Sequence, residues 1–298
     1  CRSPNVIQVT KKALSKIDDM LNDWIDKHGF EATLLPLHGG VKPALQLFEE
    51  IDSTNAEALR QLQALADTQR CVPSALIARY QSAGRGRRGR VWSSESNAGL
   101  YLTLVRGFDL EANALQGMSL VVGLAVQAAL TELGAENVRL KWPNDVLVEG
   151  KKLGGILLEL RRTVESQVVI GIGINLQLGS EQAKTFDRPV TDLLEIMTAP
   201  PSAQRLAAAL LNQLGYFINE FEQSGFKPFI ARWSEVDYYA GAAVVLSQGE
   251  RQTQGICMGI DDSGALLLEV EIDGQSEIRR FEGGEMSATL RPLGMAIK

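Results

Sequence analysis

One stretch organises this sequence: Tyr80-Gln81-Ser82-Ala83-Gly84-Arg85-Gly86-Arg87-Arg88-Gly89-Arg90-Val91-Trp92. Within it, four arginines and three glycines fill seven consecutive positions, and a tryptophan follows two residues later. Glycines allow backbone N–H groups to approach a ligand closely, and guanidinium groups offer forked donors to phosphate or carboxylate oxygens. We call residues 84–92 the arginine loop, and we predict that it binds an anion beside an aromatic side chain.

The rest of the composition is that of an ordinary globular protein, with 45% hydrophobic and 22% charged residues among 298. The formal net charge of -6 argues against a general nucleic-acid binder, so a small anionic ligand is expected rather than DNA. Three scattered cysteines and only two histidines disfavour a disulfide framework or a zinc site, and they predict a cytoplasmic location. The longest apolar run, over residues 118–130, is too short to span a bilayer, so no membrane association is expected.

The glycines of the loop also match the dinucleotide-binding pattern G-x-G-x-x-G, at Gly84, Gly86 and Gly89. In that fold the pattern opens an apolar helix packed on a parallel sheet, and an acidic residue further along binds the ribose. Here the loop leads into the polar run Ser93-Ser94-Glu95-Ser96, and no clear βαβ unit follows. The pattern therefore does not indicate a dinucleotide site.

A second polar segment, Asp52-Ser53-Thr54-Asn55, lies between a predicted strand over residues 44–51 and a predicted helix over residues 56–66. Thr54 and Glu57 have the spacing of a capping box. Two interpretations stay open. The hydroxyl groups only cap the helix, or they and the exposed N–H groups of the helix start bind a small polar ligand.

Two further segments place polar residues beside apolar strands. A strand that begins near residue 138 breaks at Pro143, so Asn144 and Asp145 are expected in a turn or a functional loop. Lys152 precedes a glycine pair, where the backbone can approach a ligand closely. Beyond the glycines, strands are expected over residues 156–160 and 168–174, paired as a hairpin that ends at Asn175.

The pattern divides the chain into three parts. Residues 1–45 are expected to form a helical appendage, truncated or degenerate, with one amphipathic helix over residues 10–28. Residues 46–240 alternate strands with helices. From 241 to 298 the pattern changes to short strands separated by turns, which is typical of a small antiparallel barrel or sandwich. The remaining predicted helices lie over residues 115–133, 203–221 and 229–239, and further strands over residues 75–80 and 97–105.

These parts together suit the nucleotide-dependent activation of a carboxylate. Arginines and a lysine would hold phosphate and carboxylate oxygens, an acidic residue would bind Mg²⁺ or accept a proton, and an aromatic ring would stack on adenine. The sequence contains no G-x-x-x-x-G-K-[ST] motif and no paired histidine ligands. The residues alone thus predict an anion-binding α/β enzyme.

Five motifs, in order and at matching spacing, resemble those of the biotin–protein ligase family. They are Asp52-Ser53-Thr54-Asn55, Gln81 to Trp92, Lys141-Trp142-Pro143-Asn144-Asp145, Lys152-Leu153-Gly154-Gly155-Ile156-Leu157 and Gly171-Ile172-Gly173-Ile174-Asn175. The segment over residues 255–291 resembles the small barrel of that family, so the resemblance runs from about residue 45 to the end. It implies an α+β fold with a class II synthetase-like mixed β-sheet flanked by helices. A small C-terminal SH3-like β-barrel would follow, and the biotin- and ATP-binding catalytic domain would span residues 46–240.

The resemblance also implies an activity, that of an AMP-forming biotin–[acetyl-CoA-carboxylase] ligase. Biotin and ATP, with Mg²⁺, would give biotinyl-5′-AMP and pyrophosphate. A lysine amine of a biotin carboxyl carrier protein would then attack the mixed anhydride. That partner is expected to be a subunit of acetyl-CoA carboxylase or of another biotin-dependent carboxylase.

Each matched residue acquires an implied role. Those implied to bind biotin are Ser53, Thr54, Asn55, Gln81, Arg85, Gly86, Arg87, Lys152 and Gly155. Those implied to bind ATP or the adenylate are Arg87, Arg88, Arg90, Trp92, Asn144 and Asn175, with Trp92 stacked on adenine. Those implied in catalysis are Lys152, Arg85, Arg87 and Asp145, with Lys152 stabilising the charge between carboxylate and phosphate. Asp145 would orient Mg²⁺, near itself and Asn175, or receive the proton of the acceptor lysine.

Two alternatives remain. Many members of this family carry an N-terminal winged helix-turn-helix and repress biotin-synthesis genes, but few residues precede Asp52 here and the first predicted helix is acidic. A bifunctional ligase and repressor is therefore the binding-module alternative. A lipoate–protein ligase is the enzyme alternative, although its relatives lack the G-R-G-R-R-G-x-x-W pattern of residues 84–92. A homodimer formed through a sheet edge is a further expectation from the family.

Overall fold

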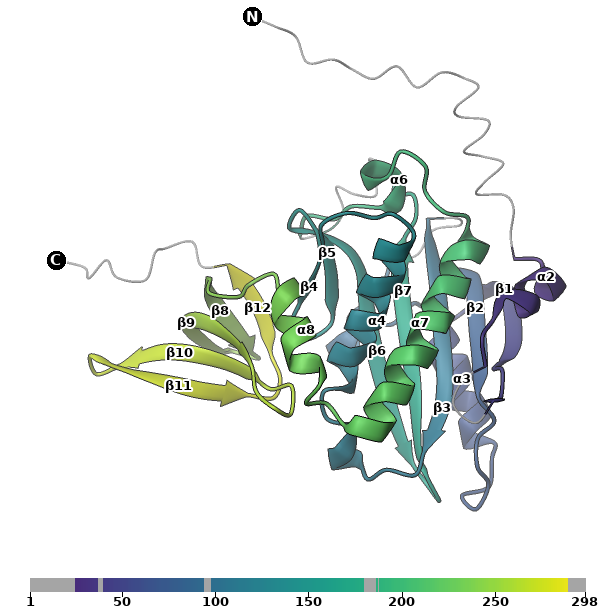
Figure 1. Ribbon diagram of the computed structural model, residues 1–298, viewed down its shortest axis with the longest axis horizontal. Coiled ribbons are helices and arrows are strands. Elements are labelled where there is room, and N and C mark those ends of the chain that lie inside the picture. The colour runs from purple at the N-terminus through teal and green to yellow at the C-terminus, as the bar shows by residue number, and fades with distance from the viewer. Residues whose placement is uncertain (1–24, 37–39, 94–97, 180–185, 187, 289–298) are drawn as a thin grey trace, which may run out of the picture.

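A seven-stranded mixed sheet and a five-stranded antiparallel sheet organise the protein (Figure 1). The structure is a computed structural model, and it describes residues 25–36, 40–93, 98–179, 186 and 188–288. The large sheet has the order β1-β2-β3-β7-β6-β5-β4, in which β1 and β2 are parallel and the other neighbours are antiparallel. Its strands are β1 (Ala44–Ile51), β2 (Ser74–Gln81), β3 (Gly99–Phe108), β4 (Val138–Lys141), β5 (Asp145–Val148), β6 (Lys151–Arg162) and β7 (Ser166–Asn175).

Two long helices cover one face of the large sheet, α4 (Met118–Glu132) and α7 (Ala203–Ser224) (Figure 1). Most residues of α4 are buried because the helix is apolar on nearly all sides, and it packs against both α7 and the sheet. The segment Ala112–Glu132, which contains α4, is long and apolar enough to cross a membrane by length and composition. Its place in the core accounts for that composition.

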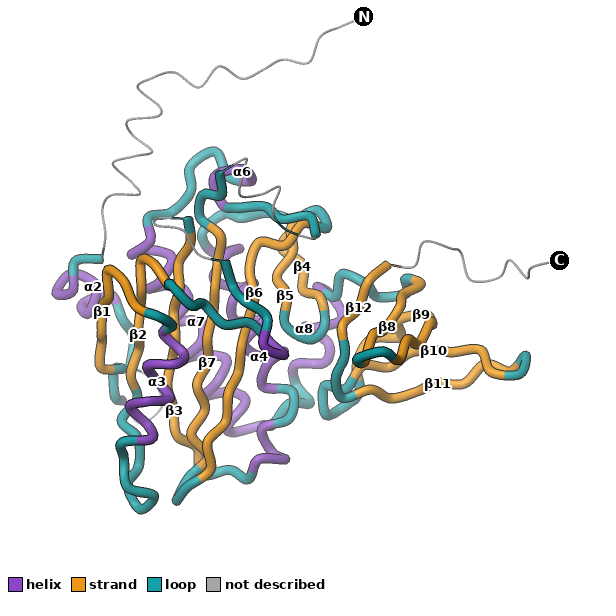
Figure 2. Tube along the Cα trace, turned by 180° about the vertical axis from the view of Figure 1, so that it is seen from behind, coloured by secondary structure: helices purple, strands orange, loops and turns teal. Residues whose placement is uncertain are grey.

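The shorter helix α3 (Thr54–Gln63) lies on the opposite face, in front of β2 and β3 in Figure 2. Side chains of a strand alternate between the two faces of its sheet. Accordingly, Ala75 and Ile77 of β2 pack in the main core, whereas Leu76 packs with Ala58 and Leu62 of α3 in a second cluster. Because α3 is short, it leaves part of this face uncovered.

The C-terminal sheet lies beside the large sheet, next to α8 (Phe229–Val236) (Figure 1). Its strands are β8 (Ala243–Gln248), β9 (Arg251–Ile260), β10 (Leu266–Ile272), β11 (Gln275–Phe281) and β12 (Glu285–Ala288), in the order β11-β10-β9-β8-β12. The indole Nε1–H of Trp142, a buried residue of the large-sheet region, donates to the carbonyl of Gly264 at 3.1 Å. This contact ties the two sheets together.

The predicted elements over residues 44–288 are confirmed apart from their ends, with two exceptions that matter for function. Asn144 and Asp145 were expected in one turn or loop, but Asp145 begins β5, which pairs with β4 and β6. Strand β6 begins at Lys151 rather than at residue 156, so Lys152 is a strand residue. The sequence did not predict the first residues of this strand because they include the pair Gly154-Gly155. Glycine is a poor strand former, and a strand that contains it depends on the neighbouring strands for its stability.

The N-terminal region is described only in part. The helix predicted over residues 10–28 lies mostly outside the described residues. Helix α2 spans Lys27–Thr33 and is capped by Asp26, whose carboxylate accepts from the N–H of Gly29 at 2.8 Å. Further along the chain, the short helix α6 spans Leu193–Ile196 and lies between β7 and α7.

Truncating the buried side chain that joins α3 to the sheet should destabilise the protein. We expect Leu76→Ala to lower the free energy of unfolding by about 2–5 kcal/mol, because Leu76 is fully buried and the change leaves a cavity. Leu160→Ala is the matched control, since Leu160 is 45% exposed on β6. Urea unfolding of both variants checks this, and equal effects would contradict it.

Candidate active site

The uncovered part of the sheet beside α3 forms the floor of a cavity of about 460 Å³. The arginine loop, the start of α3 and strands β5, β6 and β7 contribute to its walls. Every residue that the sequence predicted for the site lines this cavity: Ser53, Thr54, Asn55, Gln81, Arg85, Gly86, Arg87, Arg88, Arg90, Trp92, Asn144, Asp145, Lys152, Gly155 and Asn175. The motifs therefore converge in space, and the role of each residue stays a prediction.

Glycines make the floor flat enough for an aromatic ring to lie on it. A Cβ atom at Gly155 would lie 2.9 Å from the indole of Trp92, and one at Gly173 would lie 2.8 Å from it. A Cβ atom at Gly171 would overlap Oδ1 of Asn55. Larger residues at these positions would therefore displace the side chains above them. Within the described residues, the buried Nε1 of Trp92 has no hydrogen-bond partner.

The buried carboxylate of Asp145 lies close to three cationic side chains at the cavity. Oδ1 of Asp145 lies 2.6 Å from Nζ of Lys152, and Oδ2 lies 3.0 Å from Nζ of Lys141 and 4.0 Å from Nη1 of Arg188. Burial alone would raise the pKa of Asp145, but the charges of Lys152 and Lys141 outweigh it and lower that pKa. Burial lowers the pKa of Lys152, and Asp145 opposes this shift. The Asp145 side chain, 7% exposed, is therefore ionised and compensates its lysines.

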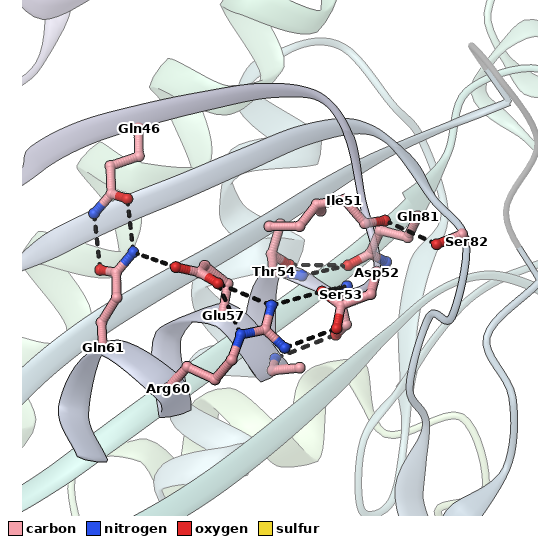
Figure 3. Close-up of polar contacts among 11 residues, drawn as sticks. Gln46, Ile51, Asp52, Ser53, Thr54, Glu57, Arg60, Gln61, Gln81 and Ser82 are labelled. Atoms are coloured by element: carbon pink, nitrogen blue, oxygen red, sulfur yellow. Dashed lines mark hydrogen bonds and ion pairs between the residues drawn. The ribbon is translucent and has the colours of Figure 1, made fainter. Parts of the chain in front are cut away.

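The start of α3 forms a polar corner of the cavity. Gln81 Oε1 accepts from the backbone N–H of Thr54 at 2.8 Å and from its hydroxyl at 3.1 Å (Figure 3). The hydroxyl of Thr103 on β3 lies 2.8 Å from Oγ1 of Thr54 and 2.7 Å from Oδ1 of Asn55. These bonds fix Thr54, Asn55 and Gln81 relative to one another.

The helix cap differs from the predicted capping box. Ser53 is the N-cap, and its Oγ accepts from the N–H of Ala56 at 3.3 Å, so the capping role of Ser53 is confirmed. The predicted Thr54–Glu57 box is wrong. The Glu57 carboxylate instead accepts from Arg60 and Gln61 on the same helix, as Figure 3 shows.

The arginine loop is folded as a short hairpin. The N–H of Trp92 donates to the carbonyl of Gly84 at 2.9 Å, and the N–H of Gly86 donates to the carbonyl of Arg90 at 2.8 Å. A 3₁₀ turn, η2 (Arg87–Gly89), forms the tip. There Gly89 has φ 74°, a left-handed conformation that favours glycine. The hairpin carries its arginines along one wall of the cavity.

The arginine side chains point to different partners. Arg87, which is partly buried, donates from Nη1 to Oδ1 of Asn144 at 3.2 Å. The amide group of Asn144 also donates to the carbonyl of Ile156 at 2.8 Å, which fixes its orientation. Arg85 donates to Glu159 of β6 at 2.8 Å, and both Nη atoms of Arg90 pair with Glu285 of β12. Arg85 and Arg90 are therefore paired with carboxylates, whereas Arg87 contacts a neutral amide.

The predicted position for Mg²⁺, near Asp145 and Asn175, stays a prediction. Among the described residues, no group of three or more His, Cys, Asp or Glu side chains could hold an ion. The oxygens of Asp145 contact two lysines, and the amide of Asn175 donates to the carbonyl of Thr191 at 2.9 Å. Mg²⁺ is commonly held by one or two carboxylates together with substrate phosphates and water. A Mg²⁺ ion here would depend on the phosphates.

Sequence reasoning missed several residues of the site. Thr103 stands in an apolar strand where threonine is an ordinary strand former, so nothing marked its hydroxyl. Glu285 follows Gly283-Gly284, a signal that was read only as part of the C-terminal barrel. Glu159 and Arg188 lie in segments without a motif. The tertiary fold brings Glu159 to the arginine loop and Arg188 to Asp145, so neither contact could be predicted from the local sequence.

Comparisons with known proteins follow the same motifs. Residues 47–175 match the model of the Biotin/lipoate A/B protein ligase family. The chain is 39% identical over 241 residues to the Bifunctional ligase/repressor BirA of Escherichia coli (strain K12), covering 80% of this chain and 71% of that protein. It is 34% identical over 262 residues to the Biotin–[acetyl-CoA-carboxylase] ligase of Mycobacterium tuberculosis, covering 85% and 92%.

Solved structures agree with these matches. The biotin protein ligase from Aquifex aeolicus in complex with biotin and ATP superposes with a TM-score of 0.66 and 30% identity, covering 82% of this chain and 97% of that one. The biotin protein ligase from Leishmania major in complex with biotinyl-5-AMP gives a TM-score of 0.54 at 25% identity, covering 80% and 99%.

The ion pair between Asp52, just before α3, and Arg60 of α3 should make the free energy of unfolding depend on pH. Arg60 donates to both carboxylate oxygens of Asp52, at 2.7 and 2.8 Å, and these bonds lower the pKa of Asp52 from 3.8 to about 2. A depressed pKa stabilises the folded state above the unfolded pKa, and this contribution is lost as pH falls through the folded pKa. We expect Asp52→Asn to cost under about 1 kcal/mol at pH 7, since the pair is partly exposed.

The difference between wild type and Asp52→Asn should shrink as pH falls below 3.8 towards about 2. Urea unfolding at a series of pH values measures it, with Asp262→Asn in an exposed turn as the control. A difference that stays constant over this range would contradict the assignment.

Proposed function

This chain belongs to the biotin–protein ligase family, and we propose that it activates biotin as biotinyl-5′-AMP and transfers the biotinyl group to a lysine of a carrier protein. It is an ATP-dependent, AMP-forming ligase. The observation that carries the proposal is the convergence of the arginine loop, Lys152 and the polar start of α3 on one cavity. The cavity has cations for two anions and a polar corner for a neutral ring.

The polar corner suits the ureido group of biotin. That group presents two N–H donors and a carbonyl acceptor, and it requires partners of both kinds in a buried site. Gln81, Thr54 and Asn55 offer amide and hydroxyl groups. Thr103 holds Thr54 and Asn55 in place, and Thr54 bonds in turn to Gln81. Ser53, at the helix N-cap, adds a hydroxyl to the lining of the same cavity.

The cations suit the joining of the biotin carboxylate to the α-phosphate. Two anions must approach each other, and preorganised positive groups lower the cost of that approach more than mobile water does. Lys152, 17% exposed, and Arg87 are the groups that we assign to this task. Asp145 holds the Lys152 ammonium at 2.6 Å, so the ammonium does not have to reorganise when the substrates bind.

Asp145 therefore serves better as a positioning residue than as a base. Its pKa is lowered by the neighbouring lysines, and a carboxylate with a low pKa is a weak acceptor for the proton of the acceptor lysine. Its contacts with the lysines also leave it poorly suited to a metal ion. We assign to Asp145 the orientation of Lys152, and we expect Mg²⁺ to enter bound to ATP. When bound, the ion supplies positive charge to the phosphates.

Trp92 is placed to respond to the nucleotide. Its indole lies on the glycine floor, where the buried Nε1–H lacks an acceptor among the described residues. The unpaired buried donor costs about 1–3 kcal/mol, whereas the Lys152 ammonium, 5.2 Å from the ring centroid, favours this position. We propose that the ring leaves the floor and stacks on adenine, with Arg88 and Asn175 at the nucleotide side of the cavity.

Two structural assignments follow from the family. We infer that the five-stranded C-terminal sheet is the SH3-like barrel of these ligases, and that it forms a domain over residues 241–298. The catalytic domain would span residues 46–240, after an appendage over residues 1–45. Gly284 and Glu285 of the C-terminal part line the cavity, which supports a contribution of this sheet to the reaction.

Partners follow from the proposed reaction. The acceptor is a biotin carboxyl carrier protein, as part of acetyl-CoA carboxylase or of another biotin-dependent carboxylase. DNA binding stays the alternative prediction, since the Escherichia coli relative is named a ligase and repressor. A homodimer and a cytoplasmic location stay predictions.

A pyrophosphate exchange assay tests the function. With biotin present, the protein should catalyse the exchange of labelled pyrophosphate into ATP, because adenylate formation is reversible. Lipoate should give no exchange above the background without a carboxylate substrate. Exchange with lipoate alone would show that the chain is a lipoate ligase and would overturn the assignment.

A further inference from the structure

Trp142 stands between the active site and the C-terminal sheet. Its side chain is buried in the main core, while Asn144 and Asp145, which follow it closely in the chain, line the cavity. The indole Nε1–H donates to the carbonyl of Gly264 at 3.1 Å. Gly264 belongs to the β9–β10 turn, residues 261–265. Three residues therefore separate a contact with the C-terminal sheet from the carboxylate that holds Lys152.

Two glycines let the β9–β10 turn approach the start of α4 closely. Gly264 has φ 82°, and Gly117, the N-cap of α4, has φ 80°. A Cβ atom at Gly264 would lie 2.9 Å from Cα of Gly117, and one at Gly117 would overlap the ring of Phe226. A larger residue at either position would hold the turn away from α4 and move the Gly264 carbonyl away from Trp142.

The carboxylate of Asp261 fixes the shape of this turn. Its Oδ1 accepts from the N–H of Ser263 at 2.9 Å, from the Ser263 hydroxyl at 2.8 Å and from the N–H of Ala265 at 2.9 Å. Burial would raise the pKa of Asp261, but hydrogen bonds from Arg280 and Ser263 lower that pKa to about 2, so the carboxylate is ionised at neutral pH. The acceptor of the indole is therefore part of a turn that maintains its own shape.

The segment that follows Trp142 has two further attachments. Oγ of Ser119 on α4 donates to the carbonyl of Pro143 at 3.1 Å. The N–H of Ile156 on β6 donates to the carbonyl of Asn144 at 3.0 Å, and the Asn144 amide group donates to the carbonyl of Ile156 at 2.8 Å. Helix α4 and strand β6 thus hold the segment from two sides, and the β9–β10 turn holds it from a third through Trp142.

We propose that Trp142 is a positioning residue, through which the β9–β10 turn sets the place of Asn144 and Asp145 at the cavity. Since Asp145 orients the Lys152 ammonium, the C-terminal sheet acts on the joining of carboxylate and phosphate from a distance. This inference rests on the proposed function, which assigns that step to Lys152. Displacing a reacting group by about 1 Å can cost about 100-fold in rate, and losing one of several attachments should cost less, about tenfold.

Single-turnover pyrophosphate release and biotin binding by the full chain test the proposal. Trp142→Phe removes the indole donor and keeps an aromatic ring. It should slow release about tenfold, while the dissociation constant for biotin stays within about twofold of wild type, because the polar corner belongs to other elements. Asp261→Ala should slow release similarly, and the double variant should be about as slow as Trp142→Phe, since both changes break one connection. A wild-type rate in Trp142→Phe, or additive effects of the two changes, would overturn the proposal.

Two control variants separate positioning from general destabilisation. Trp233→Phe removes another buried indole donor, which lies 3.3 Å from Oδ2 of Asp237, and Asp262→Ala changes an exposed residue of the same turn. Both should release pyrophosphate at the wild-type rate, although Trp233→Phe should lower the free energy of unfolding about as much as Trp142→Phe does. An equal slowing in Trp233→Phe and Trp142→Phe would assign the effect to destabilisation and contradict the proposal.

Hydrogen exchange keeps the positioning testable independently of the reaction. The amides of Asn144 and Ile156 should exchange about fivefold faster in Trp142→Phe than in wild type or in Trp233→Phe, since one attachment of their segment is lost while the sheets persist. Unchanged exchange at these two amides would overturn the positioning. If the wild type releases no pyrophosphate with biotin, the proposed function fails, and the exchange rates still decide whether Trp142 positions the segment.

Discussion

The site depends on the contact between the Asp145 carboxylate and the lysines around it. Strand β5 pairs with β4 on one side and β6 on the other, which brings Lys141, Asp145 and Lys152 from three neighbouring strands together. Each of these charges would be costly to bury alone, and breaking such a group leaves an uncompensated charge in the interior. The pairing of three short strand segments therefore provides an oriented ammonium group at the cavity, and the proposed chemistry requires that group.

The rest of the site is arranged around this fixed charge. The glycine floor provides room, the start of α3 provides neutral polar groups, and the arginine loop provides a second cation at Arg87. Of its other arginines, Arg85 pairs with Glu159 on the large sheet, and Arg90 pairs with Glu285 on the C-terminal sheet. A cluster of four arginines is thus not four equivalent ligands for an anion. Two of its guanidinium groups pair with carboxylates, whereas Arg87 reaches Asn144 inside the cavity.

The sequence could predict the site because its residues stand in local motifs at the ends of strands and helices. It could not predict β5, since the run Trp142-Pro143-Asn144 signals a turn and hides the short strand that begins at Asp145. It also could not predict the ion pairs that the loop makes with Glu159 and Glu285. Arg85 and Glu159 are 74 residues apart and Arg90 and Glu285 are 195 apart, so their pairing follows only from the fold. The strands and helices were predictable because the spacing of apolar residues along a short stretch of sequence indicates each element and its length.

Single-turnover release of pyrophosphate from biotin and ATP tests the central claim, that Lys152 stabilises the charge formed as the carboxylate joins the α-phosphate. Lys152→Ala should slow this release by about 100-fold, the usual effect of removing one preorganised group from a developing charge. The adjacent Lys151→Ala is the control, because Lys151 pairs with Glu195 outside the cavity, and its rate should equal that of wild type. A Lys152→Ala enzyme that releases pyrophosphate as fast as wild type would contradict the account.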